Sequence, residues 1–110
     1  YKKAHELRPK DAIILAGYGR ALLADGKFTR ALDILEQARV RDFRNSALLR
    51  DLGVAYAKLG KHAMASLVTA ERYALRGRIK DAKMHANRAA AGLPVGSPSW
   101  QRAQDVIDIR

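Results

Sequence analysis

The chain has 110 residues, of which 21 are basic and 11 acidic, so its formal net charge is +10. Hydrophobic residues make up 48% of it and cysteine is absent, which fits one globular domain and excludes disulfide scaffolds, cysteine-ligated zinc and thiol catalysis. The most apolar run, AIILAGYG at 12–19, is far shorter than the ~20 residues of a membrane-spanning helix. The charge favours an acidic partner without identifying one.

Helical periodicity predicts a series of helices and no strand, because no segment alternates with a period of two. Glycine and proline mark the boundaries between the helices. In chain order the expected ranges are 2–8, 11–25, 28–41, 46–59, 62–76, 79–92 and 98–108. The first range reads as the end of a helix whose partner lies upstream, so we expect the chain to be a piece of a longer protein.

Small residues recur at an interval of 34 positions. Gly19 and Gly53 form one such pair, and Gly26 and Gly60 form another. Two antiparallel helices approach closely where they cross, which favours a small residue at the crossing. A glycine in the turn adopts the left-handed conformation that ends a helix at little cost. A period of 34 residues is typical of the tetratricopeptide repeat, a helix–turn–helix unit.

The second copy, Leu49-x-x-Leu52-Gly53-x-x-Tyr56, resembles the first-helix signature of that family, with Leu49 in place of its Trp. We therefore expect an all-α, tetratricopeptide-type helical-repeat solenoid with a C-terminal capping helix. Its expected divisions are the end of a truncated upstream repeat at 1–8, a solenoid of two full repeats plus a half-repeat at 9–95, and the capping helix at 96–110.

The repeat pattern changes in the C-terminal half. Gly77 follows Gly60 after only 17 residues, which predicts successive antiparallel helices without a full extra pair. Arg72 stands where the 34-residue spacing from Ala38 predicts a small residue. At the end, Ser97-Pro98 supplies an N-cap and a first-turn proline, and Trp100 begins the apolar stripe of the cap, where we expect most of its ring to be buried.

Residues 63–106 resemble the C-terminal tetratricopeptide tail of bacterial zinc metallopeptidases of the HExxH type. The resemblance lies in the half-repeat at 64–71, in the second turn glycine with the amphipathic helix after it, and in GSPSWQRAQD at 96–105. It implies a periplasmic location, a role in envelope protein quality control, and a zinc-containing peptidase domain upstream. The alternative is a free-standing adaptor in secretion or pilus assembly.

We expect no catalytic, cofactor-binding or metal site within the chain itself. His5 begins a sequence like HExxH, but Pro9 replaces the second histidine and breaks the helix. His62 occupies the position of Phe28 in the first repeat, which predicts partial core packing. A basic nucleic-acid-associated protein is the least favoured alternative, because only 6% of residues are aromatic and no basic–aromatic strand exists for base stacking.

The expected functional surface is a groove on the first helix of each pair, the concave side in the family. Positions on those helices that face away from the core carry small, apolar and basic side chains. The candidate groove residues are Ala16, Arg20, Leu23, Arg50, Val54 and Lys58. Small side chains leave room for a ligand backbone, and arginine binds carboxylates with two hydrogen bonds. The expected partner is an acidic protein or peptide, or the protein's own upstream domain; ordinary solvated side chains are the alternative.

The helix at 11–25 has apolar residues around most of its circumference, which predicts neighbours on more than one side. Ile13 and Ile14 contribute to this surface. A solenoid end without its cap tends to stack on another chain. We therefore expect end-to-end self-association of this fragment.

Overall fold

The computed structural model describes residues 11–110, which form six α-helices and, within that range, no strand. The helices are α2 (Asp11–Ala24), α3 (Phe28–Arg41), α4 (Ser46–Lys58), α5 (His62–Leu75), α6 (Ile79–Gly92) and α7 (Pro98–Ile107). The all-α class is confirmed, and each helix from α3 to α7 begins at the predicted residue. The helix predicted at 2–8, with His5, lies outside the described residues.

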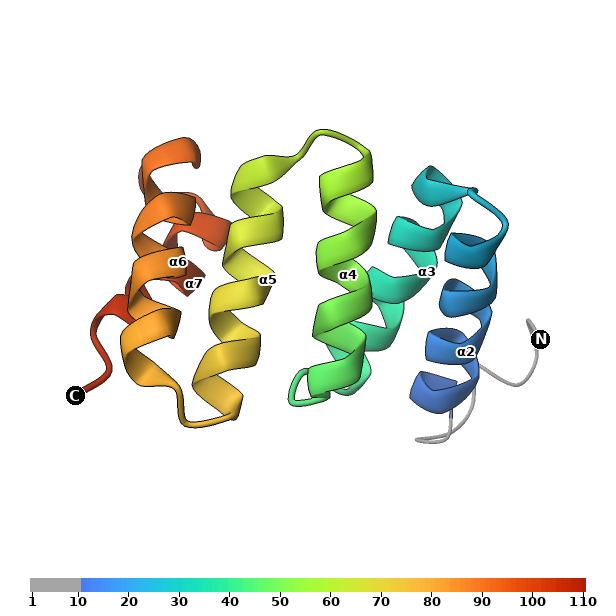
Figure 1. The fold of residues 1–110 in the computed structure, drawn as a ribbon, viewed down its shortest axis with the longest axis horizontal. Coiled ribbons are helices and arrows are strands. Elements are labelled where there is room, and N and C mark those ends of the chain that lie inside the picture. Colours follow the sequence, from blue (N-terminus) through green and yellow to red (C-terminus); the bar gives the residue numbers. More distant parts are fainter. Residues whose placement is uncertain (1–10) are drawn as a thin grey trace.

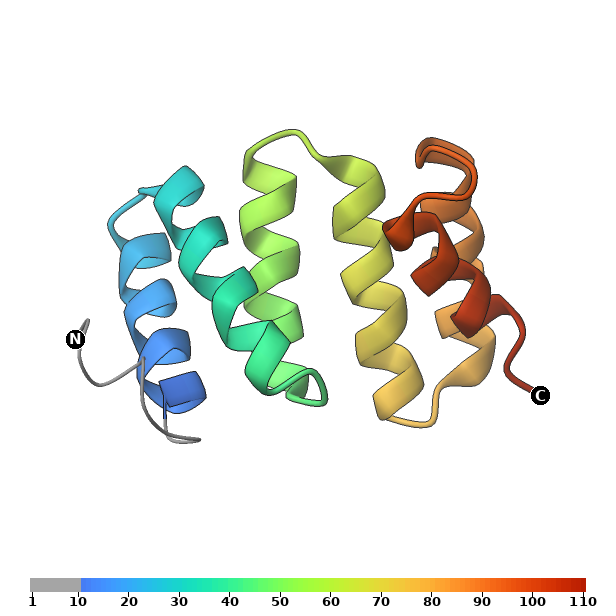
Figure 2. The same ribbon diagram turned by 180° about the vertical axis from the view of Figure 1, so that it is seen from behind.

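The helices follow one another in a row, each packed against the next along the chain (Figure 1). Further contacts among the six join α2 to α4 and α5 to α7. Seen from behind, α3 lies in front of α4 and α7 lies in front of α6 (Figure 2). The helices α3 and α7 therefore lie on one side of the row (Figure 2).

Three loops are the same turn, built on a glycine with positive φ. Gly26 and Gly60 both have φ of 74°, and Gly77 has φ of 77°. The amide after each glycine donates a hydrogen bond to a carbonyl five residues earlier, from Lys27 to Leu22, from Lys61 to Tyr56 and from Arg78 to Tyr73. This hydrogen bond and the left-handed glycine define a Schellman C-cap. The predicted glycine turns are thus present, including the one half a period after Gly60.

Side chains cap the two helices that follow other loops. The Oδ1 atom of Asn45 accepts a hydrogen bond from the amide of Leu48 at 3.0 Å. The hydroxyl of Ser97 accepts one from the amide of Trp100 at 3.2 Å, and Pro98 occupies the first turn of α7. The predicted N-cap at Ser97 is therefore confirmed. Trp100 is partly buried.

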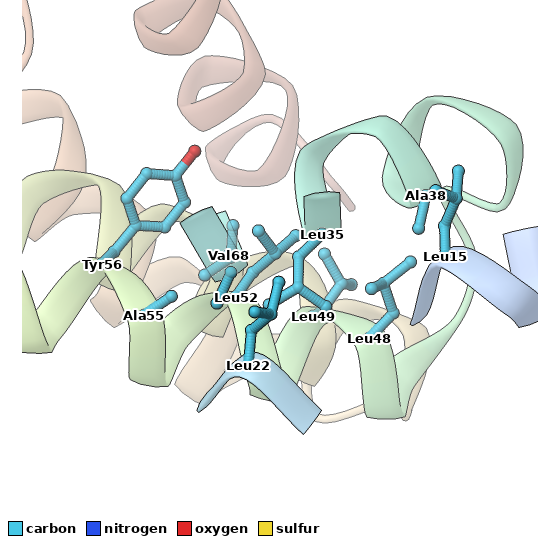
Figure 3. Close-up of a cluster of buried hydrophobic side chains, with 11 residues drawn as sticks. Leu15, Leu22, Leu35, Ala38, Leu48, Leu49, Leu52, Ala55, Tyr56 and Val68 are labelled. Atoms are coloured by element: carbon cyan, nitrogen blue, oxygen red, sulfur yellow. The ribbon is translucent and has the colours of Figure 1, made fainter. Parts of the chain in front are cut away.

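The main core lies between α2, α3, α4 and α5 and consists largely of leucines (Figure 3). Leu35 and Leu52 have no exposed surface, and Leu49 is 2% exposed. Alanines dominate the smaller clusters between α5, α6 and α7, with Ala82, Ala86, Ala89 and Ala103 all fully buried. Short side chains there let the C-terminal helices pack closely.

The two crossing glycines are not equivalent. A Cβ atom added to Gly19 would lie 2.5 Å from Cδ2 of the buried Leu35, so this crossing requires glycine. A Cβ atom on Gly53 would lie 3.6 Å from Cγ2 of Val68, an ordinary van der Waals distance. The close approach expected at both crossings therefore occurs only at Gly19.

Two positions show where the repeat comparison reaches its limit. His62, predicted to pack partly in the core, is exposed: that prediction is wrong, because a polar imidazole at the first position of α5 remains in water. At Arg72, predicted to be anomalous, the Nε atom is buried and has no hydrogen-bond partner among residues 11–110. An arginine at a position suited to a small residue thus leaves a donor unsatisfied.

Candidate interaction groove between α2 and α4

One face of α4 contributes nothing to the core. Arg50, Val54 and Ala57 recur at helical spacing on this face and are all exposed, with 43% of Val54 accessible. Leu52 and Tyr56, on the other side of the helix, are 0% and 5% exposed. The division is that of an amphipathic helix whose outer face combines small, apolar and basic side chains. The structure thus exposes these residues on one face of α4, and their role in a groove stays a prediction.

A buried carboxylate links α4 to α2 beside this face. Asp51 is 7% exposed, and its Oδ2 atom accepts a hydrogen bond from Nε of Arg20 at 3.1 Å. Nε of Arg50 lies 3.7 Å from the other carboxylate oxygen. The side chains of Arg20 and Arg50 nevertheless remain 59% and 52% exposed. One acid therefore holds two guanidinium groups from different helices on a common surface and neutralises only one of them.

The other predicted groove residues occupy different places. Ala16 and Leu23 are partly buried and pack against the main core. Lys58 lies eight residues beyond Arg50, about 12 Å along the helix axis. Its Nζ atom stands 5.9 Å from the centre of the Phe28 ring. The structure brings Arg20, Arg50 and Val54 together and sets Lys58 apart at one end.

Asp51 is the residue of this site that the sequence interpretation missed. It lies between the core position of Leu52 and the surface position of Arg50, which makes it an acid at the edge of an apolar face. An acidic residue at the edge of an apolar helix face could have been predicted to be a partly buried carboxylate. Its partner Arg20 is 31 residues away in sequence, and no local pattern predicts that pairing.

Other polar groups in the structure do not assemble into a metal centre. Within residues 11–110 there is no group of three or more histidine, aspartate or glutamate side chains placed to hold a metal ion. His85 stacks on Tyr73 with ring centroids 5.4 Å apart. Burial, and then the positive charge of Arg88, lower the pKa of His85 below its ordinary value.

Comparisons with known proteins add no relative. The chain matches no protein-family model, no curated protein and no solved structure. None of the helices in the described part of the chain is long and apolar enough to cross a membrane. The fold therefore defines the class as all-α.

Proposed function

We propose that this chain is a protein-interaction module whose candidate groove residues on α2 and α4 bind an acidic segment of a partner protein. The observation that carries the proposal is the placement of two half-exposed arginines, Arg20 and Arg50, by one buried aspartate. Burying a carboxylate requires compensation by charge and hydrogen bonds. Asp51 receives that compensation from groups that remain accessible to a ligand.

The surroundings of the two arginines suit an extended peptide. Val54 and Ala57 expose small apolar side chains next to Arg50, which leaves space for a ligand backbone. Arginine recognises a carboxylate with two hydrogen bonds, so an aspartate or glutamate in the ligand is the matching group. The net charge of +10 increases the rate at which an acidic segment reaches the surface.

The architecture that we propose for this module is a tetratricopeptide-type solenoid. Its support is the 34-residue spacing of Gly26 and Gly60, the repetition of one glycine turn, and the packing of each helix on the next. The proposed context is the non-catalytic tail of a periplasmic zinc metallopeptidase, supported by the sequence resemblance at 63–106. An HExxH helix encoded upstream would agree with this context, whereas a lipoprotein signal there would favour the adaptor.

The groove is tested by selecting peptides from a random displayed library against the chain and titrating them individually. We expect the selected peptides to be rich in aspartate and glutamate. Arg50→Gln should weaken the binding of one class of these peptides at least tenfold, or ~1.4 kcal/mol. It should leave thermal stability nearly unchanged, because exposed ion pairs contribute only about 0–1 kcal/mol.

Arg41→Gln is the matched control, since Arg41 is exposed on α3 and lies outside the groove. It removes the same charge from the same type of residue. The proposed function would be contradicted if every selected peptide bound the Arg50→Gln protein as tightly as the Arg41→Gln protein.

A further inference from the structure

A hollow of about 320 Å³ lies between α3, α5 and α7. It is lined by none of the candidate groove residues on α2 and α4. Figure 2 shows this part of the row, with α3 and α7 on the near side of the helices behind them. The hollow is therefore a separate surface feature, and its chemistry can be considered independently of the groove.

Two large apolar side chains are exposed at this hollow. Phe43, in the loop after α3, is 65% exposed, and Leu75, the last residue of α5, is 36% exposed. The fold does not use the Phe43 ring in its core clusters. Exposed apolar groups gathered at one concave place mark binding surfaces more often than isolated ones do.

Arginines surround these apolar groups. Arg102 makes two hydrogen bonds to Glu71, and Nε of Arg39 donates to Glu36 at 2.7 Å. Arg44 also lines the hollow, is exposed, and has no ion-pair partner within residues 11–110. Once each glutamate is matched with its arginine, the positive charge that remains is that of Arg44.

We propose that this hollow is a second binding site, which takes an acidic segment of a partner protein. One aromatic or aliphatic side chain of the segment inserts between Phe43 and Leu75, and one of its carboxylates pairs with Arg44. A second copy of this chain fits less well, because each copy carries a net charge of +10. If both this hollow and the groove bind acidic segments, the chain connects two such segments. Binding at either site does not require the other.

A protein segment also fits better than a nucleic acid. Phosphates would satisfy the arginines, but the apolar half of the hollow contains one aromatic ring and an aliphatic side chain rather than a series of stacking rings. An acidic peptide with an apolar residue satisfies both halves. We therefore expect the hollow to bind an acidic peptide more tightly than an oligonucleotide.

The test uses the whole 110-residue chain and peptides selected from a random displayed library, each then synthesised with a fluorescent label. We expect one class of peptides whose dissociation constant rises at least tenfold with Phe43→Ala and with Arg44→Glu. Arg50→Gln should not affect this class, which separates failure of this site from failure of the groove. Both substituted residues are exposed, so circular dichroism should show unchanged folding.

Arg41→Glu supplies the matched control. Arg41 is exposed in the last turn of α3 and does not line the hollow, yet its reversal changes the net charge of the chain equally. In a selected peptide, replacing the acidic residue by its amide should weaken binding to the native chain. The same replacement should have little effect on binding to the Arg44→Gln protein, because the pairing is already lost.

Three results would overturn the proposal. The first is that no selected peptide responds to Phe43→Ala. The second is that Arg41→Glu weakens binding as much as Arg44→Glu, since general charge attraction would then account for the effect. The third is displacement of the labelled peptides by single-stranded oligothymidylate at concentrations below those of the unlabelled peptide, which would identify the hollow as a nucleic-acid surface.

Discussion

Arg102 of α7 and Glu71 of α5 form a two-point contact across 31 positions of the sequence. Nη2 of Arg102 lies 2.5 Å from Oε1 of Glu71, and Nε lies 3.0 Å from Oε2. Both side chains are largely buried, with 22% and 23% of their surfaces exposed. The contact holds the last helix on the helix two positions before it, so it fixes the C-terminal end of the row.

Glu71→Gln should destabilise the protein by about 1.5 kcal/mol, because it removes a hydrogen bond between charged groups and leaves Arg102 partly buried without its counter-charge. Urea unfolding measures the change. The control is Asp105→Asn, the same carboxylate-to-amide change at the exposed hydrogen bond between Gln101 and Asp105 on α7, which should cost less than about 0.5 kcal/mol. Equal losses in the two variants would contradict the role assigned to Arg102 and Glu71.

Tyr56→Phe should destabilise the protein by about 1.5 kcal/mol near neutral pH, because the Tyr56 hydroxyl donates a hydrogen bond to Glu36 of α3. Burial, and then this hydrogen bond, raise the pKa of Tyr56 above its ordinary value of 10.0. The neutral form is favoured in the folded chain, so its contribution is complete below pH 10.0 and declines above it.

The stability difference between the native chain and Tyr56→Phe should therefore narrow as the pH rises beyond 10.0. Denaturant unfolding over an alkaline pH series measures this difference. Tyr73→Phe is the control, because Tyr73 stacks on His85 and its ring is retained in the variant. A difference for Tyr56→Phe that stays constant through the alkaline range would refute the assignment.

Gly19→Ala and Gly53→Ala should have opposite effects, although the two glycines are equivalent in the sequence repeat. The methyl group at position 19 must displace the buried Leu35, and overpacking of this kind costs about 1–3 kcal/mol. At position 53 the methyl group has ordinary space, so alanine's better helix propensity should stabilise by about 0.5–1 kcal/mol. Thermal unfolding of both variants is the measurement, and destabilisation by both would show that the crossings are alike.

Ile13→Lys should reduce self-association of the chain. Ile13 is 74% exposed on α2, and no other helix within residues 11–110 comes within 4 Å of a Cβ atom placed on Gly17, so no other described element covers the apolar surface there. Sedimentation at increasing concentration should show association of the native chain and less of it in the variant. Val95→Lys adds the same charge at another exposed apolar residue and controls for repulsion. A native chain that stays monomeric at every concentration would count against this prediction.

The local features of the fold could be predicted because they depend on residues close together in sequence. Glycine turns such as Gly60 and the Ser97 cap need only the chemistry of a few neighbouring residues, and periodicity locates the helices between them. The contacts of Asp51 with Arg20 depend on how two helices dock, and no spacing rule contains that information. The same limit explains Gly53. Its 34-residue spacing from Gly19 predicts a close helix crossing, but Val68 across that crossing lies at an ordinary van der Waals distance.

Local spacing also accounts for the exposure of some candidate groove residues. Helical spacing correctly separates Arg50 and Val54 from the buried side of α4, since a face is a local property. It cannot show that Lys58 turns toward Phe28, or that Phe43 and Leu75 meet at one hollow. The upstream peptidase, the periplasmic location and the partner remain predictions from the sequence.

The packing of each helix on its neighbour in the chain also governs how the protein folds. Contacts between residues close in sequence give a low contact order, and helical proteins of this kind fold within about microseconds to milliseconds. The central helix α4 has neighbours on both sides, whereas α2 closes one end of the described row. Amide hydrogens of α2 should therefore exchange with solvent before those of α4. A ligand that spans Arg20 and Arg50 would couple the two helices and slow exchange at that end.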